Sequence, residues 1–165
     1  MKLRVVIGDL DPTDLGDLDW SGGAEHIRAV GAAVQASFTG EVVVLRAGLA
    51  NGRSVGLVAV DLRVEPDAGL IWMLAVHERF QSLGLGSRLI KAAERRIAAA
   101  GRGWSRLRVE HDNPGARALY LRLGYRERGA VLDSWPVTGG RTYVTACVLM
   151  ERRLGEVTGA EPYPG

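Results

Sequence analysis

The chain has 165 residues, of which 47% are hydrophobic and 24% are charged, and its formal net charge is +2. This composition excludes a disordered chain, and no apolar run approaches the roughly 20 residues that a membrane-spanning helix needs. The single cysteine, Cys147, lies in an apolar run and cannot form an internal disulfide, so we expect a core thiol in a cytoplasmic protein. We expect one domain over residues 1–154 and a flexible tail over residues 155–165, where glycine and proline recur.

The charge is distributed unevenly along the chain. Residues 1–78 carry 6 basic and 11 acidic side chains, a net charge of −5, whereas residues 79–165 carry 15 and 8, a net charge of +7. A total so close to neutral argues against a dedicated nucleic-acid-binding protein. The split is compatible with a cationic ligand near the first half and an anionic ligand near the second, although charge counts alone favour surface variation without function.

Periodicity and turn residues predict α/β organisation in a single domain with a mixed sheet. Pro12 is typical of a first helical residue, and Gly101 and Gly124 are typical of residues that end helices. The apolar run over residues 70–76 does not alternate with polar residues, which predicts a central strand buried on both faces. In chain order, the expected elements are a strand over 3–7, helices within 9–20 and over 24–38, strands over 41–49, 55–64 and 70–76, a helix from 85 toward Gly101, a strand over 104–110, a helix over 113–123, and two strands around 138–140.

A glycine-rich loop, Gln81-Ser82-Leu83-Gly84-Leu85-Gly86-Ser87, follows the expected central strand. Its glycines and the free amides of the next helix suit a bulky phosphate group. A P-loop would need a lysine after Gly86, and a dinucleotide-binding loop would need a third glycine where Leu89 stands. The remaining pattern, Gln-x-x-Gly-x-Gly, is compatible with a pyrophosphate-binding loop or with a plain strand-to-helix turn.

A second motif runs from Glu110 to Tyr125, with the sequence Glu-His-Asp-Asn-Pro-Gly-Ala-Arg-Ala-Leu-Tyr-Leu-Arg-Leu-Gly-Tyr. Asn113 is a good N-cap residue, but capping does not explain Tyr120, although packed core tyrosines are common. The two motifs, in this order and at this spacing, resemble those of the GNAT superfamily of acetyl-CoA-dependent N-acyltransferases. The resemblance is specific over about residues 70–126.

The resemblance implies a single-domain GNAT-like fold with a mixed, mostly antiparallel seven-stranded sheet, a splayed parallel central pair and about four helices. It also implies that the amides of residues 81–87 hold the pyrophosphate of acetyl-CoA and that the N–H of Leu74 polarises the thioester carbonyl. The implied co-substrate contacts are Leu74, Val76, Gln81, Ser82, Leu83, Gly84, Leu85, Gly86, Ser87, Asn113 and Tyr120. Arg79, Arg88, Lys91 and Arg117 are candidates for the nucleotide phosphates, but a solvated charge on a helix is the better explanation for each.

The implied reaction is direct transfer, in which an amine attacks the thioester and Tyr120 gives its proton to the leaving thiolate. Some members of the superfamily carry a general-base glutamate where this chain has Leu70, so a base must come from another residue or from water. Nearby candidates are Glu110, His111, Asp61 and Glu65, and none is assigned. No metal is expected, because three scattered histidines and one cysteine lack ligand spacing.

The expected acceptor is a primary amine on a small cationic molecule. Aspartates at positions 9, 11, 14, 17 and 19, with Asp133 and Trp135, would suit a cationic amine, although helix capping explains the first five equally well. The alternatives are a peptide or protein amine, and a non-catalytic CoA-binding module of the same fold. Neither nucleic acid nor a membrane is expected as a partner, and the oligomeric state is left open, a homodimer included.

Overall fold

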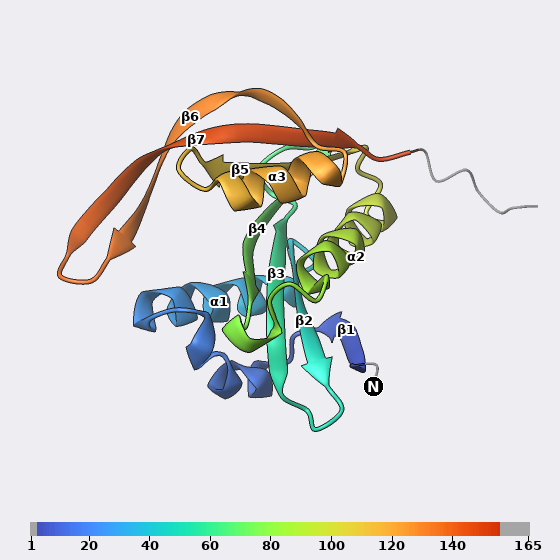
Figure 1. Ribbon diagram of the computed structural model, residues 1–165, viewed down its shortest axis with the longest axis vertical. Coiled ribbons are helices and arrows are strands. Elements are labelled where there is room, and N and C mark those ends of the chain that lie inside the picture. The colour runs from blue at the N-terminus through green and yellow to red at the C-terminus, as the bar shows by residue number, and fades with distance from the viewer. Residues whose placement is uncertain (1–2, 156–165) are drawn as a thin grey trace, which may run out of the picture.

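The computed structural model describes residues 3–155 and arranges them as one sheet with helices on both faces (Figure 1). The strands are β1 (Val5–Asp9), β2 (Val42–Leu49), β3 (Ser54–Asp61), β4 (Ala68–Val76), β5 (Trp104–Glu110), β6 (Arg126–Val137) and β7 (Arg141–Arg153). The α-helices are α1 (Ala24–Ser37), α2 (Leu85–Ala99) and α3 (Pro114–Arg122), and the short 3₁₀ helices are η1 (Pro12–Asp17), η2 (Asp19–Ser21) and η3 (Glu78–Phe80). No helix among these residues is both long and apolar enough to cross a bilayer.

The strand order is β1-β2-β3-β4-β5-β7-β6, and every neighbouring pair is antiparallel except β4 and β5. This topology confirms the expected mixed, mostly antiparallel seven-stranded sheet with a parallel central pair. Parallel neighbours need a crossover connection, and here α2 supplies it. The crossover places the start of α2 at the same end of the sheet as the end of β4.

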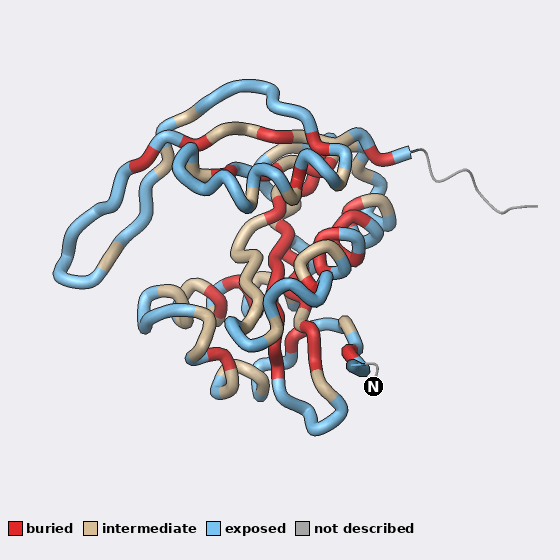
Figure 2. Tube along the Cα trace, viewed as in Figure 1, coloured by how far each residue is buried: buried red, intermediate tan, exposed pale blue. Residues whose placement is uncertain are grey.

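The two faces of the sheet bury separate apolar clusters. On one face α1 and η1 pack against β2 and β3, around Leu18, Val30 and Leu57. On the other face α2 and the end of α3 pack around Leu89, Ile97 and other residues. Figure 2 shows the buried residues gathered in the central strands and on the inner side of α2, while the outer part of the β6–β7 hairpin is mostly exposed. Cys147 is buried, as expected of a core thiol.

The acidic segment expected to be helical within residues 9–20 forms two 3₁₀ helices instead of an α-helix. Pro12 begins η1, as predicted, and the Asp11 side chain accepts a hydrogen bond from the backbone N–H of Thr13. The side chain of Asp14 in turn accepts from the N–H of Asp11, which completes a capping box. Aspartate and glycine are poor α-helix formers in a helix interior, so this sequence supports short capped turns.

Three other expectations need correction. The first strand begins at Val5 and extends to Asp9, two residues later than predicted. The third strand ends at Asp61, short of the predicted residue 64. β4 is not buried on both faces along its whole length, because it is only half-buried from Trp72 onward. The predicted flexible tail falls, apart from Gly155, on residues 156–165, which lie outside the described residues.

Candidate active site

The site begins where the central strands separate. The parallel ladder between β4 and β5 has four pairs and ends at Ile71 and Leu107, so the last five residues of β4 have no partner on that side. The pairing of β4 with β3 also shifts register, and neither Met73 nor Leu74 has a partner residue in β3. Met73 takes a left-handed φ of 58°, which is costly for a side chain of this size. The strand therefore carries a strained bulge beside an open gap, and this is why its second half is not fully buried.

The glycine loop at the end of β4 is an array of unused hydrogen-bond donors. Within residues 3–155, none of the six consecutive backbone N–H groups from Ser82 to Ser87 donates to a protein acceptor. Ser82 and Gly84 both have left-handed φ values, 66° and 78°, and Gly84 begins α2 without any side-chain cap. Within residues 3–155, apart from Gly84 and its two chain neighbours, no atom lies within 4 Å of the position that a Cβ on Gly84 would occupy. Successive free amides at a helix start, in a turn of this kind, fit the pyrophosphate of a nucleotide carrier.

Side-chain contacts hold the glycine loop, and the turn that precedes it, in place. The Gln81 side chain donates from Nε2 to the backbone carbonyl of Val76, at 3.1 Å. His77 accepts from the N–H of Arg79 at 3.1 Å, and its ring lies between those of Trp20 and Phe80, with centroids 5.4 and 5.7 Å away. The side chain of Gln81 therefore braces the loop, which leaves its backbone as the part free to meet a ligand.

The two sequence motifs meet in space. A Cβ placed on Gly86 would lie 3.6 Å from the Leu119 side chain, so the start of α2 packs beside α3. Asn113 caps α3 by accepting a hydrogen bond from the N–H of Ala116 at 3.2 Å, as predicted. Tyr120, the residue after Leu119, belongs to the same buried apolar cluster as Leu85, the first residue of α2.

Tyr120 and Tyr125 form an edge-to-face pair, with centroids 5.8 Å apart, but their hydroxyl groups differ. The Tyr125 hydroxyl donates to Glu94 at 3.2 Å and lies 2.6 Å from the Ser105 hydroxyl. The Tyr120 hydroxyl has no hydrogen-bond partner among residues 3–155, and it is not sealed from solvent. Burial raises the pKa of Tyr120 to about 12, so the phenol stays protonated at neutral pH. It is a proton donor without a protein acceptor.

The basic residues proposed for the nucleotide phosphates divide into two groups. Arg88 donates to the backbone carbonyl of Val5 at 3.0 Å, and Arg117 forms an ion pair with Glu127. Both guanidinium groups therefore already have a partner within the protein. Arg79 and Lys91 are exposed.

A cavity of about 320 Å³ opens on the other face of the sheet, where β4 and β5 diverge. It is lined by Asp61, Leu70, Ile71, Trp72, Met73, Arg108 and Asp133. Arg108 and Asp133 form an ion pair at 3.3 Å, and Asp61 is held by Arg63 at 3.0 Å. The indole N–H of Trp72 is buried without a hydrogen-bond partner among the described residues. Neither Arg108 nor Trp72 was among the predicted site residues, although alternation along the strand over 104–110 places Arg108 on the same face as Glu110.

The candidate general bases differ in their pKa shifts and in their ion-pair partners. Burial alone would raise the pKa of Asp61, but hydrogen bonds from Arg63 outweigh it and lower that pKa. Burial, together with the neighbouring Asp112, raises the pKa of Glu110. Glu65 precedes β4 in the chain and pairs with Arg106. Of these carboxylates, Glu110 is the one whose pKa is shifted upward, the direction that favours a general base.

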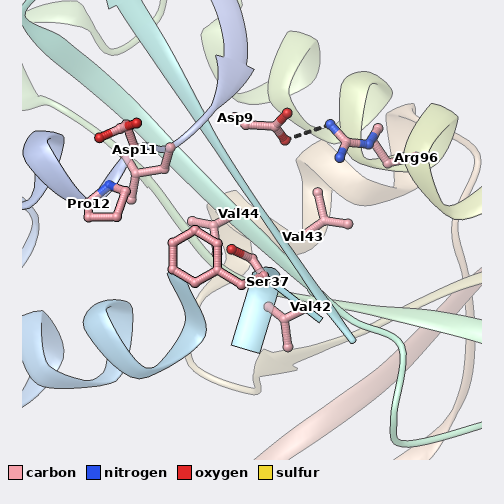
Figure 3. Close-up of a pocket in the computed structure, with 10 residues that line it drawn as sticks. Asp9, Asp11, Pro12, Ser37, Val42, Val43, Val44 and Arg96 are labelled. Atoms are coloured by element: carbon pink, nitrogen blue, oxygen red, sulfur yellow. Dashed lines mark hydrogen bonds and ion pairs between the residues drawn. The ribbon is translucent and has the colours of Figure 1, made fainter. Parts of the chain in front are cut away.

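The aspartates of the N-terminal segment are mostly used by the fold. Arg96 pairs with Asp9 at 2.7 Å, Arg46 lies 3.8 Å from Asp14, and Asp17 accepts from the N–H of Ser54 at 2.6 Å. Asp9 also lines a separate cavity of about 300 Å³ between β1, β2 and the end of α1 (Figure 3). These carboxylates cap the segment and hold it in place by ion pairs and hydrogen bonds, in agreement with the helix-capping interpretation.

The geometry agrees with comparisons to known proteins. A family model described as the acetyltransferase (GNAT) family matches residues 19–125, which is more than half of the chain. The chain belongs to the GNAT family of acetyltransferases. Members of this family use acetyl-CoA as the acetyl donor. A comparison with curated protein sequences finds no significant match.

Solved structures share the fold of this GNAT protein at low sequence identity. The ribosomal-protein-S18-alanine N-acetyltransferase from Escherichia coli is 21% identical, with a TM-score of 0.70 over 97% of this chain and 99% of that one. Ard1 from Thermoplasma volcanium is 20% identical, with a TM-score of 0.73 over 92% and 99%. Spermidine N-acetyltransferase from Vibrio cholerae, solved with CoA and spermine, is 16% identical, with a TM-score of 0.68 over 90% and 95%. At these identities the likeness shows the fold.

Proposed function

We propose that this GNAT protein transfers an acetyl group from acetyl-CoA to the primary amine of a small cationic molecule, by direct attack within a ternary complex. The observation that carries the proposal is the run of free amides from Ser82 to Ser87, next to the gap between β4 and β5. The acceptor cavity, at about 320 Å³, lies at the small end of ligand pockets and suits a small molecule. Its two carboxylates, Asp61 and Asp133, are paired with Arg63 and Arg108, but each has further lone pairs that can accept a hydrogen bond from an ammonium group, which favours a cationic acceptor.

The chain's own residues would bind the co-substrate in two places. The loop amides would hold the pyrophosphate, because fixed N–H dipoles replace water around the anion at little further cost in ordering. The unpaired side of β4, including Val76, would accept the amide-containing arm of CoA as an added strand. The N–H of Leu74, in the bulge, would stabilise negative charge on the thioester oxygen, an effect worth about 3 kcal/mol at comparable sites.

Proton transfers complete the reaction. An ammonium acceptor must lose one proton before its nitrogen attacks, and Glu110, directly or through water, is the proposed acceptor of that proton. The new C–N bond then forms and the C–S bond breaks, while Tyr120 donates to the departing sulfur. A second proton leaves the nitrogen and replaces the one that Tyr120 gave up. The net reaction releases one amide, one thiol and one proton per turnover.

The test is release of free thiol from acetyl-CoA with a panel of acceptors. The panel contains alkyl amines, diamines, polyamines and short peptides with free N-termini. Turnover of amines and not of peptides supports the proposal. Turnover of peptides alone would replace the small acceptor with a peptide, and tight CoA binding without any turnover would favour the non-catalytic module.

A further inference from the structure

The β6–β7 hairpin carries a pair of aromatic side chains that the reaction above does not use. Figure 1 shows the hairpin extending well beyond the rest of the sheet. In its register Asp133 faces Thr145, and Trp135 faces Tyr143. Alternate residues of a strand project from the same face, so Trp135 and Tyr143 lie on the face that carries Asp133.

Asp133 connects this face to the acceptor cavity. Its carboxylate lines the cavity and pairs with Arg108 at 3.3 Å. Trp135 is two residues farther along β6, which corresponds to roughly 7 Å along a strand. The aromatic pair therefore continues the wall of the cavity outward, toward the tip of the hairpin.

The two rings form one surface. The centroids of Trp135 and Tyr143 are 5.1 Å apart, and the ring planes are tilted by 48°. The side chains remain 38% and 40% exposed, so the described residues leave them open to a ligand. Large aromatic side chains that pack together at a cavity mouth bind apolar groups well, because they are stiff and lose little entropy on binding.

The opposite face of the same hairpin provides a contrast. Leu132 and Val144 are 73% and 59% exposed, so apolar exposure alone does not distinguish the two faces. Leu132 and Val144 alternate with the residues that point toward Asp133 and Arg108, and they therefore face away from the cavity. Only the face of Trp135 and Tyr143 is continuous with the site.

We propose that Trp135 and Tyr143 bind the apolar part of the acceptor, and that this acceptor is a primary amine joined by a short chain to an aromatic or other apolar group. The proposal rests on the proposed acetyl transfer at the neighbouring cavity. The carboxylates of Asp61 and Asp133 hold the ammonium group at the inner end, and the aromatic pair holds the apolar group at the outer end. A short amine reaches the cavity but leaves the pair uncovered.

The test compares butylamine with phenylbutylamine, which differ by one phenyl group. We expect phenylbutylamine to have a kcat/KM about tenfold higher in the unaltered protein, because stacking on an aromatic pair contributes on this scale. Trp135→Ala and Tyr143→Ala each lower the kcat/KM of phenylbutylamine more than that of butylamine, so the ratio of the two values falls toward one. Trp135→Phe keeps a ring and retains most of the preference. Thermal unfolding of each variant verifies that the hairpin substitutions leave the fold intact.

Leu132→Ala and Val144→Ala are the matched controls, since they remove apolar groups from the other face and leave the ratio unchanged. A ratio that survives in Trp135→Ala and Tyr143→Ala, or that falls equally in the controls, overturns the inference while the acetyl transfer stands. A dimer that dissociates in Trp135→Ala, with unchanged kinetics, assigns the pair to self-association instead and also overturns it. No turnover of either amine overturns the proposed function, and this inference with it.

Discussion

The two packed tyrosines allow one substitution to be compared with a close control. Tyr120→Phe and Tyr125→Phe remove the same atom from two rings that touch each other. Tyr120 has no protein partner for its hydroxyl among the described residues, whereas Tyr125 has Glu94 and Ser105. We expect the first change to affect catalysis and the second to affect stability.

The expected loss of stability in each variant follows from the hydrogen bonds that the substitution removes. Tyr125→Phe removes contacts of 2.6 and 3.2 Å and leaves the hydroxyl of Ser105, which is fully buried, without its partner. A lost buried hydrogen bond costs about 1 kcal/mol and a stranded buried group about 1–3 kcal/mol, so the free energy of unfolding should fall by about 2–4 kcal/mol. For a chain of this length, that lowers Tm by roughly 4–16 °C. Tyr120→Phe breaks no protein hydrogen bond and should change stability by less than about 0.5 kcal/mol.

The effects on kcat should be the reverse, with the larger loss in Tyr120→Phe. Without the Tyr120 proton, kcat should fall about 100-fold while the KM for acetyl-CoA changes little, which is the usual contribution of a general acid. Tyr125→Phe should keep nearly full kcat at a temperature where the variant is folded. The assays are thiol release under saturating acetyl-CoA and urea unfolding followed by tryptophan fluorescence. Equal losses of stability, or a larger loss of kcat in Tyr125→Phe, would refute the assignment of Tyr120 as the donor.

Three further predictions concern packing, the loop and pH. Gly69→Ala should destabilise the protein by about 1–3 kcal/mol, because its Cβ would lie 2.5 Å from an atom of Ile97, whereas Gly103→Ala, with open space around it, should be nearly neutral in thermal unfolding. Gly84→Ala should weaken CoA binding by calorimetry while the apo protein stays folded, since φ is +78° there and the strained loop would shift its amides; unchanged affinity would contradict the loop's role. Stability should be full below pH 10 and fall as pH rises toward 12, because burial raises the pKa of Tyr120 to about 12 and also raises the pKa of Tyr125, so the folded state keeps both protons after the unfolded chain, whose tyrosines ionise near 10.0, has lost them. Urea midpoints across this range test the sign, and Tyr120→Phe should make the fall less steep without abolishing it.

The segment that carries the two motifs was the most predictable part of the fold. The strand Trp104–Glu110 and the N-cap at Asn113 were predicted at the residues where they occur. Here local chemistry and tertiary structure agree, because capping, helix ends and strand periodicity each act over a few residues. The roles of Leu74 and Tyr120 in the reaction remain predictions.

Other features depend on contacts between distant residues. The strain at Met73 exists because β4 must leave β5 while staying on β3, and an unbroken apolar sequence contains no sign of it. The cavity proposed for the acceptor combines Asp61, Arg108 and Asp133 from three strands that are far apart in sequence. The acidic N-terminal segment gave an ambiguous signal, because the same aspartates that suit a cationic ligand also suit capping and ion pairs.

The interrupted ladder between β4 and β5 links the stability of this protein to the binding of a ligand. Only four residue pairs join these two strands, and the arm of CoA proposed to bind there would pair with the residues of β4 beyond Ile71. A ligand present at a hundredfold excess over its Kd adds about 2.7 kcal/mol to the unfolding free energy. Bound CoA would thus protect the folded protein from proteases and heat, whereas the ligand-free protein would unfold and be cleaved more readily.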